Sequence, residues 1–433
     1  MIDQPAVPSG TPPAEPVQNL KGFQDFLPGQ MRARTRLENS IRQTFERFGF
    51  EPVETPALEY ASLLLGKYGA EADRQVYIFE DRGGRRVGLR YDQTVPTARL
   101  LAQYRSQLPR YWRRYQLQDV FRTEKPQQGR YRQFRQADCD IFGSSSPLAD
   151  AEILAVFYAV YADLGFDDLV IKLNDRRLLV AAVSEFATGQ TDVFSIIQSI
   201  DKLDKKEPEA VSDELVAKGL TAATVKQIFS VLENTDQSEY LAEIVDKTIK
   251  LGVPAEALVF NPRLARGLDY YTGMIFEGKL GGQPDKAVGG GSVGGGGRYD
   301  NLIEELAGAS VPAVGFGIGF DRTLEAAAER GLLTVAAGPA QVMVALFEDT
   351  VAAGLELGNR LRQAGISTEI YPALDPLSKQ LKVANQKRIP WVAMIGPTEA
   401  NERQVTVKEL ATGRQQTLSL DEVAEWLSSK TKS

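Results

Sequence analysis

Short strand-like runs joined by short turns constrain the fold of this 433-residue chain more than any other feature. The runs lie at 75–80, 86–91, 119–124 and 131–142, and one of the turns lies at 82–85. Parallel neighbours would need crossovers of a dozen or more residues, which such turns do not supply. The pattern therefore predicts an antiparallel sheet rather than a doubly wound nucleotide-binding fold.

Helical patterns surround these runs. Apolar residues recur at helical spacing from Arg36 until Gly49, and the two prolines of 50–56 indicate an extended segment at a sheet edge. Residues from about 176 to 256 are helical in pattern and indicate an insertion. After it, the segment 313–330 has the pattern of a glycine-rich strand that leads into a helix. We therefore expect an α+β domain.

The C-terminal part of the chain has a different pattern. Strand-like runs at 342–346, 367–371 and 391–395 alternate with helical runs at 349–364 and 377–387. This β-α-β-α-β order predicts a parallel sheet in a separate α/β domain. The expected boundaries are a disordered leader at 1–17, a first domain at 18–330, a linker at 331–340 and a second domain at 341–433.

The composition limits the catalytic groups and metal sites that the chain can have. The chain contains no histidine, the commonest general base near neutral pH, and its one cysteine, Cys139, excludes an internal disulfide and a cysteine-cluster metal site. Any reaction must use carboxylates, arginines, phenols and backbone groups. No glycine run precedes Lys-Ser or Lys-Thr, which excludes a P-loop. We find no signal peptide and no apolar run long enough to span a membrane, so we expect a cytoplasmic protein.

Positive charge is concentrated in one segment although the net charge is −7. Residues 105–135 hold nine basic and two acidic side chains. This local excess indicates a site for a polyanion. Arg122 and Glu124, two positions apart on an expected strand, share a face on which arginine can grip phosphate oxygens. On charge alone, a solvated basic hairpin is an equally good interpretation.

Three motifs identify a family. They are Phe121-Arg122-Thr123-Glu124-Lys125-Pro126-Gln127, the run Arg266-Gly267-Leu268-Asp269-Tyr270-Tyr271-Thr272-Gly273, and the cluster Gly294 to Gly297 followed by Arg298-Tyr299-Asp300. With them, nearly the whole chain resembles histidyl-tRNA synthetases, which are class II aminoacyl-tRNA synthetases. The resemblance implies a class II antiparallel sheet flanked by helices, a helical insertion, and a C-terminal α/β anticodon-binding domain.

The glycine cluster and the 313–330 segment each allow a second interpretation. Composition alone favours a flexible linker for 289–297, whereas the family has a glycine-rich strand there. Alternate glycines at 315–319 could leave room for a flat adenine, and Arg322 could then reach the γ-phosphate. Close packing of a buried strand on a helix would explain those glycines equally well.

The amino-acid pocket is expected from two pairs of residues. Asp92 and Thr94 would share one strand face and hold an α-ammonium group, while Gln136 and Asp140 stand four apart on another strand. By resemblance, Gln136 orients the amino acid and Asp140 accepts a hydrogen bond from the imidazole. Tyr271 would read the other ring nitrogen.

The family's remaining roles are carried over by motif. Arg266 would stabilise the transition state of adenylation, with Arg122 on the α-phosphate as the second catalytic residue. The resemblance implies that ATP is bound by Arg122, Glu124, Arg130 and Arg322. Arg266 and Tyr270 would join the residues named above in binding histidine. Gln127 would contact the tRNA acceptor end. Mg²⁺ would arrive with ATP, and no protein-bound metal is expected.

The resemblance implies a histidine–tRNA ligase that acts as a homodimer on histidine, ATP and tRNA(His), with Pro56 near the dimer interface and no membrane partner. The main alternative is a histidine-biosynthesis regulatory subunit of the same fold. That subunit typically lacks the C-terminal domain and the motif arginines, whereas this chain keeps Arg122, Arg266 and Arg322. A catalytically inactive paralogue that binds tRNA is a third interpretation.

Overall fold

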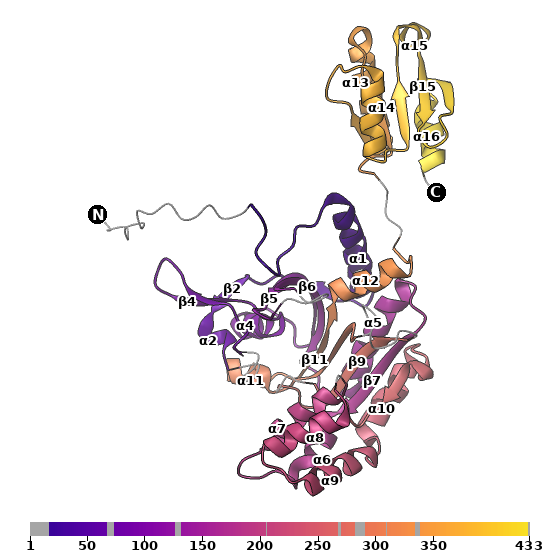
Figure 1. Ribbon diagram of the computed structural model, residues 1–433. Coiled ribbons are helices and arrows are strands. Elements are labelled where there is room, and N and C mark those ends of the chain that lie inside the picture. Colours follow the sequence, from indigo (N-terminus) through magenta and orange to yellow (C-terminus); the bar gives the residue numbers. More distant parts are fainter. Residues whose placement is uncertain are drawn as a thin grey trace, which may run out of the picture. The chain divides into compact units, whose positions relative to one another are not determined.

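The computed structural model describes residues 17–66, 73–125, 131–204, 206–266, 270–281, 291–308, 310–333 and 338–431 (Figure 1). They form two compact units, one holding 17–25 and 34–333 and the other 26–33 and 338–431. The expected disordered leader lies outside the described residues, apart from Val17. No helix in the described ranges combines the length and the apolar character needed to cross a membrane.

An eight-stranded sheet is the centre of the larger unit, in the order β1-β5-β6-β11-β10-β9-β7-β8. Its strands are β1 (Glu51–Pro52), β5 (Trp112–Phe121), β6 (Gln133–Phe142), β7 (Leu169–Asp175), β8 (Leu258–Phe260), β9 (Met274–Leu280), β10 (Gly294–Arg298) and β11 (Ala313–Gly319). The inner strands pair antiparallel, while β1 and β8 at the two edges run parallel to their neighbours. The predicted antiparallel sheet and the edge position of the 50–56 segment are confirmed.

A small second sheet accounts for the first two predicted strands. It pairs β2 (Leu58–Tyr60), β4 (Arg86–Leu89) and β3 (Ile78–Glu80) in that order, and α2 (Ala61–Leu64) follows β2. The predicted runs at 75–80 and 86–91 are therefore antiparallel neighbours, as expected, but outside the main sheet.

The expectation that Asp92 and Thr94 lie on a strand is wrong. Strand β4 ends at Leu89, and α4 (Thr94–Tyr104) begins at Thr94 itself. Proline is favoured in the first turn of a helix, where its missing N–H costs no hydrogen bond, and Pro96 occupies that turn. The Asp92 carboxylate also accepts from the backbone N–H of Val95 at 3.2 Å, which satisfies one of the free donors at the helix start.

Helices cover both faces of the main sheet. One face packs on α1 (Pro28–Arg47), α5 (Pro147–Asp163), α10 (Glu239–Lys250) and α12 (Phe320–Glu329), in a core that includes Phe45, Phe157 and Phe316. The other face has a second core formed with α4 and the insertion helices α6 (Arg176–Ser184), α7 (Val193–Ile200), α8 (Pro208–Ala217) and α9 (Ala222–Glu233). These helices, with α10, confirm the predicted helical insertion (Figure 1).

The smaller unit has a five-stranded sheet in the order β13-β12-β14-β15-β16. Strands β12 (Val342–Ala345), β13 (Thr368–Ile370) and β14 (Trp391–Met394) are parallel, as predicted. An antiparallel hairpin of β15 (Gln404–Glu409) and β16 (Gln415–Ser419), which we did not predict, extends one edge. Helices α13 (Val351–Gln363), α14 (Leu377–Gln386), α15 (Pro397–Glu402) and α16 (Val423–Thr431) complete this unit.

The glycines at 294–297 form strand β10, so the linker interpretation is wrong for them. β10 lies between β9 and β11 in the sheet. A Cβ atom at Gly296 would overlap the carbonyl oxygen of Gly315 and lie 2.6 Å from the Cα of Phe316. Glycine is therefore needed here for the close approach of two backbones rather than for flexibility.

We predict that Gly296→Ala destabilises the protein by about 1–3 kcal/mol or more, because its methyl group would meet backbone atoms that cannot move aside. Urea unfolding of the full chain measures the change. Gly189→Ala is the matched control, since nothing lies within 4 Å of a Cβ at Gly189. Equal stability of the two variants would contradict this explanation of the β10 glycines.

Candidate active site

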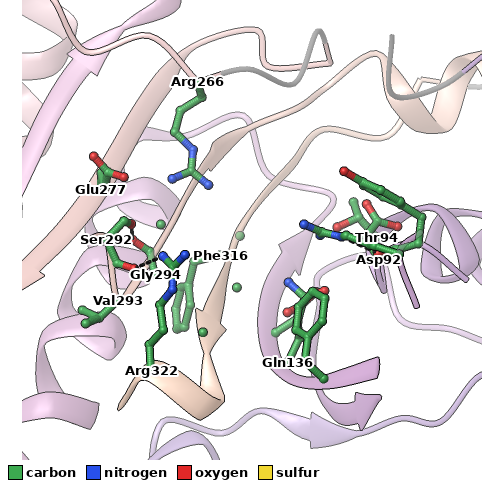
Figure 2. A pocket seen from close by; sticks show the side chains of 18 of the residues that line it. Asp92, Thr94, Gln136, Arg266, Glu277, Ser292, Val293, Gly294, Phe316 and Arg322 are labelled. Atoms are coloured by element: carbon green, nitrogen blue, oxygen red, sulfur yellow. Dashed lines mark hydrogen bonds between the residues drawn. The ribbon is translucent and has the colours of Figure 1, made fainter. Parts of the chain in front are cut away.

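A cavity of about 570 Å³ lies in the larger unit and brings the predicted site residues together. Its lining includes every predicted residue that the structure describes: Asp92, Thr94, Arg122, Glu124, Gln136, Asp140, Arg266, Tyr270, Tyr271 and Arg322. Gln127 and Arg130 lie outside the described residues. Figure 2 shows Arg266 and Arg322 on one side of the cavity and Asp92, Thr94 and Gln136 on the other.

Strand β6 supplies acidic and amide groups to the floor of this cavity. Because side chains alternate along a strand, Gln136, Asp138 and Asp140 all face the cavity. The alternate residues, such as Ala137 and Cys139, are buried in the helical core on the opposite face. Burial raises the pKa of the Cys139 thiol well above its usual range, so this thiol stays neutral.

Glycines on β11 make room for these side chains. Gly315 pairs with Asp140 and Gly317 with Asp138. A Cβ at Gly315 would overlap the Asp140 carboxylate, and one at Gly317 would lie 2.8 Å from Oδ1 of Asp138. The first two glycines of the 315–319 run are therefore required by carboxylates of the neighbouring strand. The interpretation that these glycines also leave room for an adenine stays a prediction.

Arg114 and Tyr299 hold the Asp140 carboxylate in place. The guanidinium Nη2 of Arg114, on β5, lies 2.6 Å from Oδ2 of Asp140, and both side chains are almost fully buried. The Tyr299 hydroxyl donates a hydrogen bond to Asp140 Oδ1. Burial raises the pKa of Asp140, while Arg114 and Tyr299 oppose that rise. The carboxylate is thus fixed in orientation and has a permanent counter-charge.

Arg266 lies over β10 on the other side of the cavity. A Cβ at Gly295 would overlap its guanidinium, so this glycine gives the arginine its room. Burial lowers the pKa of Arg266, but the charges of Tyr271, Glu277 and other neighbours more than offset this and hold it above its usual value. The backbone carbonyl of Arg266 accepts from Arg176 of the insertion at 3.2 Å. The result is a permanently charged group held at the edge of the cavity.

The expectation that Arg122 and Glu124 lie on a strand is also wrong. Strand β5 ends at Phe121, although the N–H of Arg122 still donates to the carbonyl of Arg132 at 2.9 Å. The Arg122 guanidinium lies 4.1 Å from the ring centroid of Tyr91 and 5.1 Å from that of Phe134. Such contacts stabilise a cation over aromatic faces. Both Arg122 and Glu124 still line the cavity, and Nη1 of Arg122 lies 4.0 Å from Oε1 of Glu124.

Arg322 enters from the start of α12, and its Nη1 donates to the carbonyl of Ser292 at 2.8 Å (Figure 2). Two other basic residues of the 105–135 segment form ion pairs with helices that pack on the sheet. Arg113 pairs with Glu152 on α5, and Arg135 pairs with Glu38 on α1 but also lines the cavity. The polyanion interpretation of this segment stays a prediction.

Several residues of the site were not predicted from the sequence. Asp138 could have been found, because the alternation that pairs Gln136 with Asp140 includes it. No sequence signal connected Arg114 to Asp140, since their contact depends on the register of β5 against β6. The insertion residues Gln198, Asp201 and Lys202 also line the cavity, and a helical pattern alone could not place them there. Within the described ranges, no group of three or more acidic or cysteine side chains could hold a metal ion.

Comparison with known proteins places the whole chain in one group. A family model described as histidyl-tRNA synthetase matches residues 22–323, and one described as an anticodon binding domain matches residues 341–430. The histidine–tRNA ligases of Wolinella succinogenes and Rhodopirellula baltica are each 37% identical to this chain. The first comparison covers 95% of this chain and 98% of the relative, and the second covers 92% and 94%.

Comparison with solved structures gives the same result as comparison of sequences. The histidyl-tRNA synthetase from Nostoc superposes with a TM-score of 0.80 at 29% identity, over 96% of this chain and 99% of that one. A Bacillus halodurans protein described as an ATP phosphoribosyltransferase regulatory subunit/histidyl-tRNA synthetase has a TM-score of 0.71 at 19% identity, over 86% and 97%. At that identity the likeness shows a common fold and nothing more.

We predict that Arg114→Met lowers the free energy of unfolding by about 3–5 kcal/mol, because it leaves the buried Asp140 carboxylate without its counter-charge. Adding Asp140→Asn should restore part of the loss, since the orphaned charge is then gone. Urea unfolding measures both. Lys250→Met, which breaks an exposed pair with Asp246, should cost about 1 kcal/mol or less. An Arg114→Met loss as small as that of Lys250→Met would contradict the assigned role.

Proposed function

Because the chain belongs to the histidyl-tRNA synthetase family, we propose that it is a histidine–tRNA ligase, which activates histidine with ATP and transfers it to the 3′ end of tRNA(His). One observation supports this above the others: ten predicted substrate-binding residues from distant parts of the chain line one cavity. The proposed organisation is a catalytic domain at 18–330 with the insertion at about 176–256, a linker at 331–340 and an anticodon-binding domain at 341–433.

The proposed histidine site uses the deep end of the cavity. The imidazole would lie between the Asp140 carboxylate and the Tyr271 hydroxyl, with Tyr270 beside them. The rings of Tyr270 and Tyr271 are 4.8 Å apart, and both side chains are largely buried. A carboxylate whose orientation is fixed by Arg114 can distinguish a ring N–H from an apolar side chain, because an apolar substrate would bury its remaining acceptor positions without a donor. Asp92, Thr94 and Gln136 would hold the amino-acid end.

The proposed chemistry is an in-line displacement at the α-phosphate. An oxygen of the histidine carboxylate attacks the α-phosphorus of ATP, a new P–O bond forms, and the bond to pyrophosphate breaks. Arg266 and Arg122 would neutralise the charge that develops on the phosphate oxygens. The charge of each arginine is set before substrate arrives, so little reorganisation is needed.

The remaining ATP contacts are assigned to the outer part of the cavity. Glu124, Arg130 and Arg322 would bind ATP, with Arg322 toward the γ-phosphate, and Gln127 would contact the tRNA acceptor end. Mg²⁺ would enter on the phosphates of ATP and offset their charge, since Mg²⁺ sites usually combine few protein carboxylates with substrate phosphates. Transfer to the ribose hydroxyl needs no histidine base, because a phosphate oxygen of the adenylate can accept the proton.

The partners and the compartment are proposed by analogy with the family. We assign a homodimer with the segment ending at Pro56 near its interface, tRNA(His) as the nucleic-acid partner, and a cytoplasmic location. The regulatory-subunit alternative has less support. Arg122, Arg266 and Arg322 all line the cavity, and the C-terminal unit that such subunits typically lack is present.

We predict that histidine alone among the twenty amino acids stimulates exchange of pyrophosphate into ATP. The reason is that another side chain would leave the remaining acceptor positions of Asp140, and the Tyr271 hydroxyl, unmatched in a buried site. The measurement is an ATP–pyrophosphate exchange assay with each amino acid in turn. Stimulation by a different amino acid, or by none in a folded preparation, would refute the ligase assignment.

We also predict that Arg266→Ala slows single-turnover adenylation by about a hundredfold or more while histidine still binds, as expected for a charge that acts mainly in the transition state. Arg263→Ala is the matched control, since Arg263 pairs with Glu233 and does not line the cavity. Adenylation at the parental rate in Arg266→Ala would show that this arginine is not catalytic.

A further inference from the structure

Side chains from the end of β7 and the start of α6 hold the segment that leads to Arg266. Between the end of β8 and Arg266 the chain forms no helix or strand. The side-chain amide of Asn174 donates to the carbonyls of Pro262 and Leu264, at 3.1 and 2.9 Å. The guanidinium Nη1 of Arg176 donates to the carbonyl of Arg266 at 3.2 Å. Three alternate carbonyls thus accept from side chains, as they would from a neighbouring strand.

Arg176 joins this segment to the helical insertion. It is the first residue of α6 and is 3% exposed. Its backbone N–H donates to the carbonyl of Gly273 at 2.9 Å, while its guanidinium donates to the carbonyl of Arg266. One residue of the insertion therefore contacts both ends of the motif that runs from Arg266 to Gly273. A substitution at Arg176 would remove the first of these ends from its grip and leave the backbone contact with Gly273 in place.

The insertion also approaches Arg266 through α7. Helices α6 and α7 pack together, and the Arg176 guanidinium lies 5.9 Å from the ring centroid of Phe194 on α7. Directly after α7 comes the short turn Asp201–Asp204, and Asp201 lines the cavity. Burial lowers the pKa of Arg266, and Asp201 is one of the neighbours whose charge raises it again. The insertion therefore acts on both the backbone and the charge of Arg266.

We propose that Arg176 is a positioning residue for adenylation, which holds the backbone of Arg266 so that its guanidinium stays over the glycine floor of the cavity. This inference rests on the proposed function. Figure 2 shows that the Arg266 guanidinium points into the cavity, and Gly295 gives it room there. Because the guanidinium is several bonds from the backbone, a small tilt of the backbone displaces it by more. A misplacement of about 1 Å can slow a reaction by about a hundredfold.

The first test separates rate from binding on the full chain. In Arg176→Met, single-turnover adenylation should slow by about tenfold to a hundredfold, because Arg266 loses its support. The dissociation constant for histidine, measured by calorimetry, should change by less than about threefold, since the lost effect acts mainly in the transition state. Arg176→Lys keeps a cationic N–H donor and should recover most of the lost rate. Arg176→Gln, whose side chain is shorter, replaces Arg176→Met if that variant does not fold.

The matched control is Arg177→Met, on the same turn of α6. Arg177 pairs with Asp175 and does not line the cavity. This variant should adenylate histidine at the parental rate, because its side chain has no contact with the carbonyl of Arg266. A loss as large as that of Arg176→Met would mean that any damage to the start of α6 slows the reaction, which contradicts a specific role for Arg176.

A second test asks whether Arg176 acts through Arg266. In an Arg266→Ala background the guanidinium to be positioned is absent, so adding Arg176→Met should slow adenylation by less than about twofold. An equal loss in both backgrounds, a parental rate in Arg176→Met, or a loss of histidine binding that matches the loss of rate would each overturn this inference and leave the ligase assignment standing. Absence of histidine-dependent adenylation in the unmodified protein would instead refute the proposed function, and this inference with it.

Discussion

Buried carboxylates in the middle of a β-sheet are the constraint on which the rest of this site depends. Asp138 and Asp140 project from β6 into a floor that must also accommodate a substrate, and the neighbouring strands have room because they carry glycine at the matching positions. Gly315 and Gly317 provide space for the carboxylates, and Gly295 provides space for Arg266. Gly315 and Gly317 thus follow from the sheet register, since each pairs with the residue of β6 whose carboxylate it accommodates, and Gly295 follows from the position of Arg266.

The same arrangement sets opposing demands on stability and binding. Burying a carboxylate costs free energy unless a partner compensates it, and Arg114 compensates Asp140 within the fold. Asp138 has no equivalent partner among the described residues that would satisfy its Oδ1 atom. Part of the cost of burying Asp138 is therefore not offset within the fold. Such a site is expected to gain order and stability when it is occupied.

Local patterns in the sequence predicted the secondary structure well and the neighbours of each residue poorly. The antiparallel sheet, the helical insertion and the parallel C-terminal strands follow from periodicity and turn length. Asp92 and Thr94 were placed on a strand because the strand-like run at 86–91 precedes them. A helix begins there instead, with Pro96 in its first turn and the Asp92 carboxylate accepting from the N–H of Val95. Alternation shows which face Asp140 occupies, but only the pairing of β5 with β6 brings Arg114 to it. The roles of the individual site residues stay predictions, because geometry places them together without showing what they bind.

The cavity residues are widely separated along the chain, and this separation determines how late in synthesis the site can form. Asp140 on β6 pairs with Gly315 on β11, which follows it by 175 residues, and the helical insertion is made between them. Contacts of such long range form slowly during folding, because the intervening chain must first be brought together. While the protein is being made on a ribosome, a chain that stops short of β11 leaves the backbone N–H and C=O groups along one edge of β6 unpaired. A truncated product would therefore be prone to aggregate and unable to form the complete cavity, so the ability to bind substrate arises late in synthesis.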